Sequence, residues 1–346
     1  MENSDSLKLN HKFLGCSGLL VSNVCLGTIP FGRTGLLGAG AGGDVTDVAF
    51  DILDRYADLG GNFIDTADVY AFGKSEQIIG QWLSRQEREK FVISTKVRSP
   101  VDPTNPNKVG LSRRHITSNV DESLRRLGTH YIDLYQIQLW DEAVPLEETL
   151  RTLSDLVRCD KVRYIGICNA TGWQLQKALD TSEYLNLHPV ISLQTQYSLT
   201  SRTFEWELER VCSDNGVGVM ATLPLASGRL FEDTKTGAGK SNGGTSQDTS
   251  LPVQVLRDEI KTIAADNNKT VSQVSIRWSL QKSIVASVVI YPTTIAELDD
   301  GLGASAGWSL SNEEMRKLDE FSSVKAPYPY DVMKMGNLGR YNRYSV

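Results

Sequence analysis

Three residues of types that exchange protons lie near the ends of two successive β-strand patterns. Asp65 lies near the end of the run 63–67, Tyr70 follows five residues later, and Lys96 lies near the end of the run 91–97. A buried ammonium is costly unless it is paired, and Asp65 on the neighbouring strand is the obvious partner for Lys96. A tyrosine can donate a proton, and a nearby cation favours the phenolate that remains. The pattern therefore suits carbonyl reduction, in which hydride addition creates an oxyanion that must be protonated.

Short apolar runs alternate with amphipathic stretches along the chain, which is typical of repeated βα units. Eight runs predict strands, at 24–29, 63–67, 91–97, 131–138, 162–168, 191–196, 218–222 and 287–291. The stretches that follow them predict helices, at 45–59, 75–84, 113–127, 146–158, 172–182, 204–215, 253–267 with 271–281, and 295–302. Eight such units close a parallel (β/α)8 TIM barrel of the α/β class, whose catalytic residues lie at the carboxyl ends of the strands.

No Pro- or Ser-rich linker divides these repeats, so we predict a single domain over 1–346. Within it the barrel covers about 24–303 and a C-terminal helix and tail cover 311–346. Three segments fall outside the repeat. They are a possible β-hairpin at 12–24 that could close the barrel floor, a long Gly/Ser/Thr-rich loop at 233–250 after the seventh strand, and an irregular tail at 322–346.

Composition excludes several classes of protein. The chain has 346 residues, of which 36 are basic and 42 acidic, so the net charge is −6 and no basic surplus exists for nucleic acid. No apolar run reaches the roughly 18–20 residues that span a membrane, and the polar first residues are unlike a secretory signal. The five cysteines are scattered and have no metal-ligand spacing, so we predict a cytoplasmic, reduced protein without a metal site.

Residues 38–43 read Gly-Ala-Gly-Ala-Gly-Gly and satisfy the pattern G-x-G-x-x-G of dinucleotide-binding Rossmann folds. That mechanism needs the glycines directly after a strand, so that the following helix meets the pyrophosphate. Here eight residues, including Pro30, separate Ile29 from Gly38. We therefore interpret the segment as a loop.

The residues around the strand ends closely resemble those of the aldo-keto reductases, over roughly 12–320. The segments that carry the resemblance are VCLGT at 24–28, GNFIDTADVY at 61–70, ISTK at 93–96, GLSRRHI at 110–116, YIDLYQ at 131–136 and DKVRYIG at 160–166. They look most like the bacterial, fungal and potassium-channel β-subunit branch. The resemblance implies a (β/α)8 barrel that binds NADPH without a Rossmann motif and reduces a small-molecule carbonyl substrate.

The family uses a catalytic tetrad of Asp, Tyr, Lys and His. Asp65, Tyr70 and Lys96 match it, but the histidine position is Gln138. Glutamine can donate a hydrogen bond to a carbonyl oxygen but cannot titrate, so part of the roughly 10²–10⁴-fold benefit of general acid–base catalysis could be lost. The resemblance implies Tyr70 as proton donor, Lys96 and Asp65 as the groups that tune it, and Gln138 as the group that orients the carbonyl.

The cofactor-binding residues that the resemblance implies are Gly27, Thr28, Asp65, Cys168, Asn169, Gln194, Thr222, Leu223, Leu225 and Thr293. Several of them depart from the family. Cys168 replaces the usual Ser, and Thr222 stands where an aromatic ring usually stacks on nicotinamide. After the eighth strand no cation is present for a 2′-phosphate, and Glu297 would repel one. We predict NADPH as the cofactor, with NADH possible and weaker 2′-phosphate discrimination than usual, and Phe31 and Trp140 as substrate-pocket walls.

Three functions therefore remain open on the sequence. The first is an NAD(P)H-dependent oxidoreductase that reduces an aldehyde, ketone or activated double bond. The second is a catalytically weakened barrel that acts as a cofactor- or ligand-binding regulatory protein. The third is a repurposed lyase, isomerase or cyclase that uses Tyr70 and Lys96 without hydride transfer.

Overall fold

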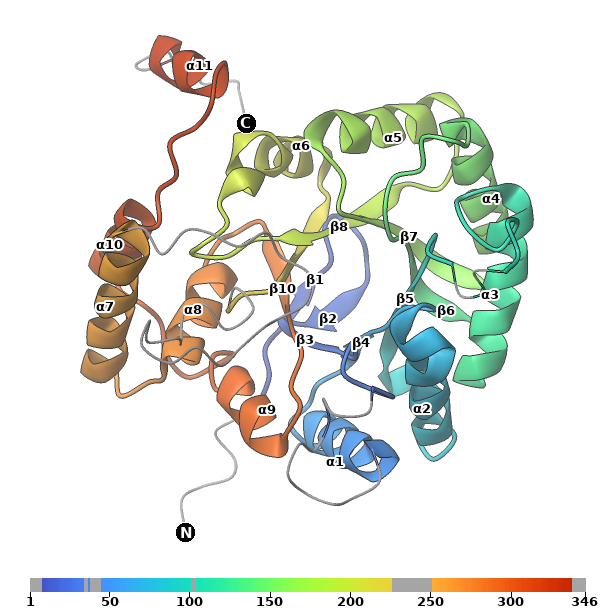
Figure 1. The fold of residues 1–346 in the computed structure, drawn as a ribbon, viewed down its shortest axis with the longest axis horizontal. Coiled ribbons are helices and arrows are strands. Elements are labelled where there is room, and N and C mark those ends of the chain that lie inside the picture. Colours follow the sequence, from blue (N-terminus) through green and yellow to red (C-terminus); the bar gives the residue numbers. More distant parts are fainter. Residues whose placement is uncertain are drawn as a thin grey trace.

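Eight parallel strands close into a barrel in the computed structural model, which describes residues 8–33, 37, 45–100, 102, 104–225 and 251–337. The strands are β3 (Val24–Gly27), β4 (Phe63–Asp65), β5 (Val92–Val97), β6 (Ile132–Ile137), β7 (Val162–Cys168), β8 (Val190–Gln196), β9 (Gly218–Thr222) and β10 (Val285–Ile290). They pair in the order β10-β3-β4-β5-β6-β7-β8-β9, and Figure 1 shows them at the centre of a ring of helices. The predicted (β/α)8 TIM barrel is confirmed.

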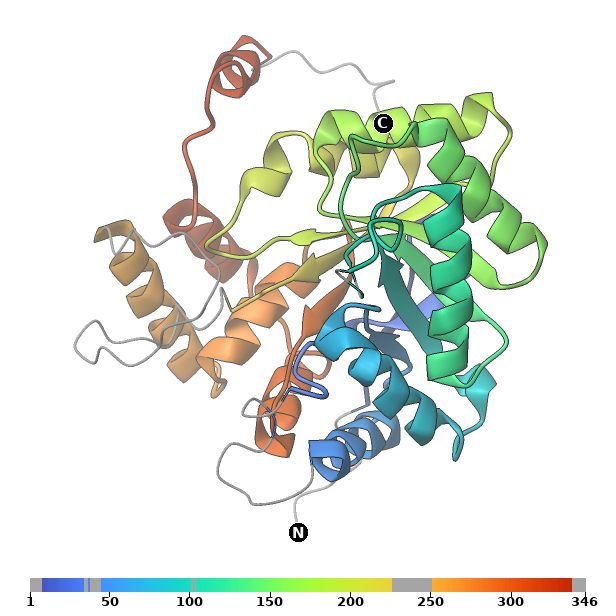
Figure 2. The ribbon, with the colours of Figure 1, turned by 45° about the vertical axis from the view of Figure 1, so that its right-hand side comes forward.

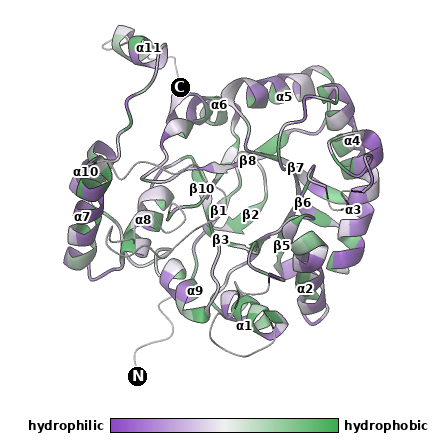
Figure 3. Cartoon of the chain, in the orientation of Figure 1, coloured by the Kyte–Doolittle hydropathy of each residue, from purple (hydrophilic) through white to green (hydrophobic). Residues whose placement is uncertain are grey.

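The helices of the repeat lie close to their predicted bounds. They are α1 (Val45–Asp58), α2 (Lys74–Leu83), α3 (Arg113–Leu127), α4 (Leu146–Arg158), α5 (Gly172–Tyr184), α6 (Leu208–Asn215), α7 (Leu251–Asp266), α8 (Val271–Leu280) and α9 (Ile295–Leu302). In α3, for example, the apolar residues Ile116, Val120 and Leu127 are fully buried against the barrel. Figure 3 shows hydrophilic residues on these helices and hydrophobic ones concentrated in the strands.

The predicted N-terminal hairpin closes the floor of the barrel. Its strands β1 (His11–Phe13) and β2 (Leu20–Ser22) are antiparallel, and its buried residues Leu14 and Val21 join the apolar cluster inside the barrel. Gly15 has a φ of +62° there, and a Cβ at this position would lie 2.5 Å from the carbonyl oxygen of Gly216. Glycine is thus required where the hairpin backbone meets the barrel.

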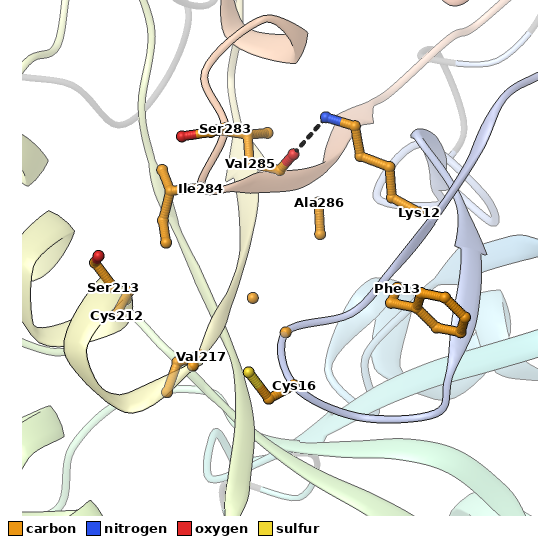
Figure 4. Close-up of a pocket in the computed structure, with 13 residues that line it drawn as sticks. Lys12, Phe13, Cys16, Cys212, Ser213, Val217, Ser283, Ile284, Val285 and Ala286 are labelled. Carbon is orange, nitrogen blue, oxygen red and sulfur yellow. Dashed lines mark hydrogen bonds between the residues drawn. The ribbon is translucent and has the colours of Figure 1, made fainter. Parts of the chain in front are cut away.

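A cavity of about 270 Å³ lies beside this hairpin, at the amino-terminal ends of the strands (Figure 4). Lys12 at its edge donates hydrogen bonds to the carbonyl oxygens of Leu280 and Val285, at 3.1 and 3.0 Å. None of the predicted site residues lines this cavity. It belongs to the floor and not to the mouth where the strands end.

The C-terminal part differs from its prediction. The helix α10 (Asn312–Phe321) packs beside α7, but the following tail, predicted to be irregular, contains the short helix α11 (Tyr330–Gly336). It starts because the Tyr330 and Asp331 amides donate to the carbonyl oxygen of Pro327, and Figures 1 and 2 show it standing away from the barrel. The predicted loop 233–250 and the glycine segment 38–43 lie outside the described residues. Within the described ranges, none of the helices combines the length and the hydropathy needed to cross a membrane.

Candidate active site

A buried ion pair lies at the carboxyl ends of β4 and β5. The Lys96 ammonium nitrogen lies 2.6 Å from Asp65 Oδ2, 2.8 Å from the carbonyl oxygen of Thr66 and 3.4 Å from Tyr70 Oη. Lys96 and Asp65 are almost wholly buried. The structure therefore brings three of the four predicted catalytic residues into one hydrogen-bonded group.

Strand register and a sharp turn position these residues. β4 and β5 are parallel, with Asp65 opposite Ser94, so that Lys96 lies two residues further along its strand and on the same face. Tyr70 begins a 3₁₀ turn in which Ala71 and Phe72 have left-handed φ angles of 48° and 53°. Such angles cost non-glycine residues of order 1–3 kcal/mol each, so the surrounding fold must hold the turn that carries Tyr70.

Two residues that were not predicted as site residues complete the support of Asp65. Ser94 Oγ donates to Asp65 Oδ1 at 2.8 Å, and Gln136 Nε2 donates to the same oxygen at 3.2 Å and to Ser94 Oγ at 2.7 Å. The signal was present in the sequence, because strand alternation places Ser94 and Gln136 on the inward face together with Lys96. Asp65 is thus held from two directions besides the ion pair.

The charges of this group suit proton donation. Burial by itself lowers the pKa of Lys96, but the charge of the Asp65 carboxylate opposes this, and the pKa lies well above its ordinary value. Burial raises the pKa of Tyr70 to about 12, whereas the Lys96 charge acts in the opposite direction. At neutral pH the group consequently holds a charged ammonium beside a protonated phenol, which is the state a proton donor needs.

Gln138 follows β6 and is tied to the mouth through its backbone. Its amide donates to the carbonyl oxygen of Val97 at 3.0 Å, and its own carbonyl oxygen accepts from Asn169 Nδ2 at 3.2 Å. Its side-chain oxygen is buried and has no hydrogen-bond partner among the described residues. The Gln138 side-chain oxygen thus lacks the donor that a buried acceptor normally has.

Cys168, Asn169 and Gln194 lie together at the ends of β7 and β8. Cys168 Sγ lies 3.6 Å from Gln194 Oε1, and the Asn169 amide donates to the carbonyl oxygen of Gln194 at 2.9 Å. Burial raises the pKa of the Cys168 thiol to about 12, although Lys96 opposes this shift. The Gln194 Nε2 donor is buried without a partner among the described residues. An amide oxygen such as that of a nicotinamide carboxamide would satisfy it.

Gly27 and Thr28 end the first barrel strand, but their surroundings differ. Thr28 Oγ1 donates to the carbonyl oxygen of Asp65 at 3.1 Å and accepts from Ser75 Oγ at 2.8 Å, so the fold already uses it. Gly27 lies under the ring of Tyr291, and a Cβ there would collide with that ring. Sequence reasoning gave Tyr291 no site role, because its position depends on how the chain leaves β10.

The remaining predicted cofactor residues line the rim. The Thr222 carbonyl oxygen accepts from the Tyr197 amide at 3.4 Å, and Leu223 has a left-handed φ of 54°. Leu225 lines a second cavity, which Tyr291 also lines. Thr293 donates hydrogen bonds from its amide and hydroxyl to Glu297.

The two predicted substrate-pocket walls have different environments. Phe31 is fully buried in the main apolar core, so its ring presents no exposed surface. Trp140 is partly buried and meets Trp173 edge to face, with ring centroids 5.6 Å apart and an interplanar angle of 67°. Trp173 is 57% exposed. The described residues contain no cluster of three or more metal-ligating side chains.

Comparison with known proteins agrees with this geometry. The model of the aldo/keto reductase family matches residues 23–323. The uncharacterized oxidoreductase YrpG of Bacillus subtilis is 35% identical over 327 residues, which cover 90% of this chain and 95% of that protein. An aldo-keto reductase of Fusarium vanettenii is 33% identical, covering 93% and 92%, and a versiconal hemiacetal acetate reductase of Aspergillus parasiticus is 32% identical, covering 91% and 98%. The chain therefore belongs to the aldo/keto reductase family and is an oxidoreductase.

Proposed function

We propose that the protein reduces an aldehyde, ketone or activated double bond of a small molecule with NAD(P)H, and that Tyr70 donates the proton. The observation that carries this proposal is the Lys96 ammonium, which contacts both Asp65 Oδ2 and Tyr70 Oη. The names of relatives such as versiconal hemiacetal acetate reductase and norsolorinic acid reductase also describe reduction.

The chain's own residues move and balance the proton. A bound nicotinamide supplies the hydride to the carbonyl carbon. As charge grows on the carbonyl oxygen, Tyr70 gives that oxygen its phenolic proton, and the neighbouring Lys96 ammonium stabilises the phenolate left behind. Asp65 keeps Lys96 charged and in place, with Ser94 and Gln136 fixing the carboxylate.

Gln138 orients the carbonyl by donating a hydrogen bond from its side-chain nitrogen, whereas its buried side-chain oxygen, which has no described partner, can only accept. An amide cannot titrate near neutral pH, so Gln138 exchanges no proton with the substrate. We propose that Trp140 forms a wall of the pocket beside it, without the fully buried Phe31.

The residues at the mouth fit a nicotinamide cofactor. The unpartnered Gln194 donor, with Asn169 and Cys168 beside it, is available to hold the carboxamide. Gly27, Thr28, Thr222, Leu223, Leu225 and Thr293 complete the proposed cofactor surface. No aromatic ring stands at Thr222, so we expect the cofactor to be held more by its amide and its distal end than by stacking there.

Replacing Tyr70 with Phe tests the mechanism. We expect Tyr70→Phe to lower kcat by about 10²–10⁴-fold, the usual size of general acid catalysis, while nucleotide binding changes little. Tyr184→Phe, which alters a fully exposed phenol on α5, serves as the control and should leave kcat unchanged. Full turnover by Tyr70→Phe would remove Tyr70 from this role.

Fluorescence titration with NADPH and NADH separates the other functions. Saturable quenching together with turnover on a panel of carbonyl compounds supports the reductase. Binding without turnover on the whole panel would favour a regulatory binding protein. The absence of binding of either nucleotide would favour a lyase, isomerase or cyclase.

A further inference from the structure

Arg98 is the first residue after β5, at the mouth where the strands end. It lies two residues beyond Lys96, so its position continues the alternation that places Ser94 and Lys96 on the inward face. The carbonyl oxygen of the preceding residue, Val97, accepts from the Gln138 amide at 3.0 Å. Arg98 is therefore close in the chain to Lys96 and beside the residue proposed to orient the carbonyl.

The backbone of Arg98 has an unusual conformation. Its φ is +145°, whereas the other described non-glycine residues with a positive φ have values between 48° and 62°. The Arg98 carbonyl oxygen accepts from the Gly110 amide at 2.8 Å, which holds the chain there. Such strain persists only where the surrounding structure imposes it, and it is common at ligand sites. An arginine kept at a position that favours glycine indicates that its side chain is used.

The guanidinium of Arg98 has no partner in the described part of the chain. Its Nε is buried without a hydrogen bond, and none of the described residues forms an ion pair with it. A carboxylate does lie in the same region, because a Cβ on Gly110 would lie 2.5 Å from Asp141 Oδ2. Asp141 instead accepts from the amides of Leu111 and Ala143, at 2.8 and 3.0 Å.

Other arginines of low exposure are paired with acids. Three of them each contact a carboxylate oxygen at 2.6 Å, in the pairs Arg88–Asp133, Arg126–Glu76 and Arg202–Glu205. Arg98 is half-buried, so its charge is partly removed from water, yet it lacks such an anion. A charge in this position is costly unless a counter-ion balances it. Since the side chain is still partly exposed, a dissolved anion can reach it and supply that balance.

The chemistry of the guanidinium selects the anion. An arginine binds a carboxylate through two parallel hydrogen bonds, and its single charge balances that of one carboxylate. Two residues along a strand span roughly 6–7 Å. A carbonyl held at Tyr70 and a carboxylate held at Arg98 can therefore belong to one small molecule.

We propose that Arg98 binds a carboxylate of the substrate, and that the substrates are oxo-acids with a short spacer, such as one ring, between the carbonyl and the carboxylate. The inference rests on the proposed function, since it takes the reacting carbonyl to lie at Tyr70 and Lys96. Arg98 is then a specificity-determining residue that takes no part in proton transfer.

Two substrates that differ in charge test this. 4-Formylbenzoate carries a carboxylate across a benzene ring from its aldehyde, and methyl 4-formylbenzoate is its uncharged ester, whose carbonyl is the more electrophilic. We expect the wild-type kcat/KM for the acid to exceed that for the ester by about 10–100-fold. Arg98→Met should reduce this ratio to about 1. Arg98→Lys should give an intermediate ratio, because an ammonium forms no bidentate pair.

The design separates the charge of Arg98 from its backbone. Both variants keep a side chain at the strained position, so they change the charge without relieving the strain. Arg151→Met, on the exposed face of α4, is the matched control and should keep the wild-type ratio. Calorimetry with 4-(hydroxymethyl)benzoate, the reduced form of the acid, measures binding without turnover.

The outcomes distinguish this inference from the proposed function. A wild-type ratio near 1, or a ratio that Arg98→Met leaves unchanged, would overturn the inference while the reductase stands. If neither aldehyde is reduced but 4-(hydroxymethyl)benzoate binds, and Arg98→Met abolishes this binding, the carboxylate site stands and the reductase is wrong. The absence of both turnover and binding would overturn both.

Discussion

Two buried ion pairs lie on opposite sides of β5. Inside the barrel, Lys96 and Asp65 are 2.6 Å apart, and outside it Arg126 and Glu76 are also 2.6 Å apart. The side chains of both pairs are 5% exposed or less. Adjacent residues of β5 contact the two pairs. Lys96 points into the barrel toward Asp65, and Thr95 points out of it and donates from Oγ1 to Glu76 Oε1 at 2.7 Å.

The two pairs differ in what else they contact. Arg126 also reaches Ser123 and packs under the turn after Tyr70, where a Cβ on Gly73 would lie 2.8 Å from Arg126 Cδ. Lys96 instead directs a further contact to the Tyr70 hydroxyl at the mouth. The two ion pairs are thus equally short and similarly buried, yet one has a structural role and the other a proposed chemical role. A buried ion pair by itself predicts neither.

The largest expected effect comes from Lys96→Met. It removes the charge that stabilises the Tyr70 phenolate, so we expect kcat to fall by about 10²–10⁴-fold. It also leaves Asp65 buried and unpaired, which costs about 3–5 kcal/mol of the free energy of unfolding. Steady-state kinetics and urea unfolding measure the two effects.

The double variant Asp65→Leu with Lys96→Met separates these effects. Replacing both partners with apolar residues should recover much of the stability, because no unpaired charge remains, yet activity should stay low. Recovery of activity together with stability would mean that Lys96 acts only through folding. The comparison between the two ion pairs would then fail.

The second expected effect comes from Arg126→Met, which breaks the outer pair. It leaves Glu76 buried and unpaired, so we expect a loss of about 3–5 kcal/mol in urea unfolding. Activity per folded molecule should fall by less than about tenfold, because Arg126 contacts the turn after Tyr70 and not Tyr70 itself. Arg316→Met, which breaks exposed pairs with Glu313 and Glu320, should leave the free energy of unfolding nearly unchanged. A loss of kcat as large as that of Lys96→Met would make the outer pair part of the chemistry.

Only part of this comparison could be predicted from the sequence. The periodicity of strands and helices predicted the barrel, because buried parallel strands and amphipathic helices have strong hydrophobic patterns. The predicted bounds agree to the residue for β7, β9, α3, α4 and α9. The inward side chains Asp65 and Lys96 were predictable as partners, because adjacent parallel strands end side by side. The short helix α11 was not, because its start depends on a local turn at Pro327.

The sequence contains no comparable pattern that would predict the outer ion pair of Glu76 and Arg126. Glu76 and Arg126 lie on different helices, 50 positions apart, and their meeting depends on how α2 and α3 pack against β5. Tyr291 was missed for a similar reason, since its ring position depends on the turn after β10. Contacts between elements that are not sequence neighbours therefore had to come from the structure.

The smallest expected effect concerns Asp68, which lies between Asp65 and Tyr70 and faces the outer pair. Both carboxylate oxygens of Asp68 are buried without a hydrogen-bond partner among the described residues. Burial, and then the charge of Glu76, raises the pKa of Asp68 to about 8, although Arg126 opposes the shift. The folded protein therefore binds this proton more tightly than the unfolded chain, whose Asp has a pKa near 3.9.

The sign of the pH dependence follows from that difference. The stabilisation from protonated Asp68 is complete below about pH 4 and is lost as the pH rises through about 8. Asp68→Asn mimics the protonated form, so its stability relative to the wild type should rise by about 1–3 kcal/mol between about pH 5 and pH 9. Thermal or urea unfolding across this range measures the change, and Asp51→Asn on the exposed face of α1 should show none. If the difference in unfolding free energy between Asp68→Asn and the wild type stays constant over this pH range, Asp68 is ionised throughout. Arg126 would then balance the charges of both Asp68 and Glu76. The outer cluster would be a three-residue charge network and not a simple pair.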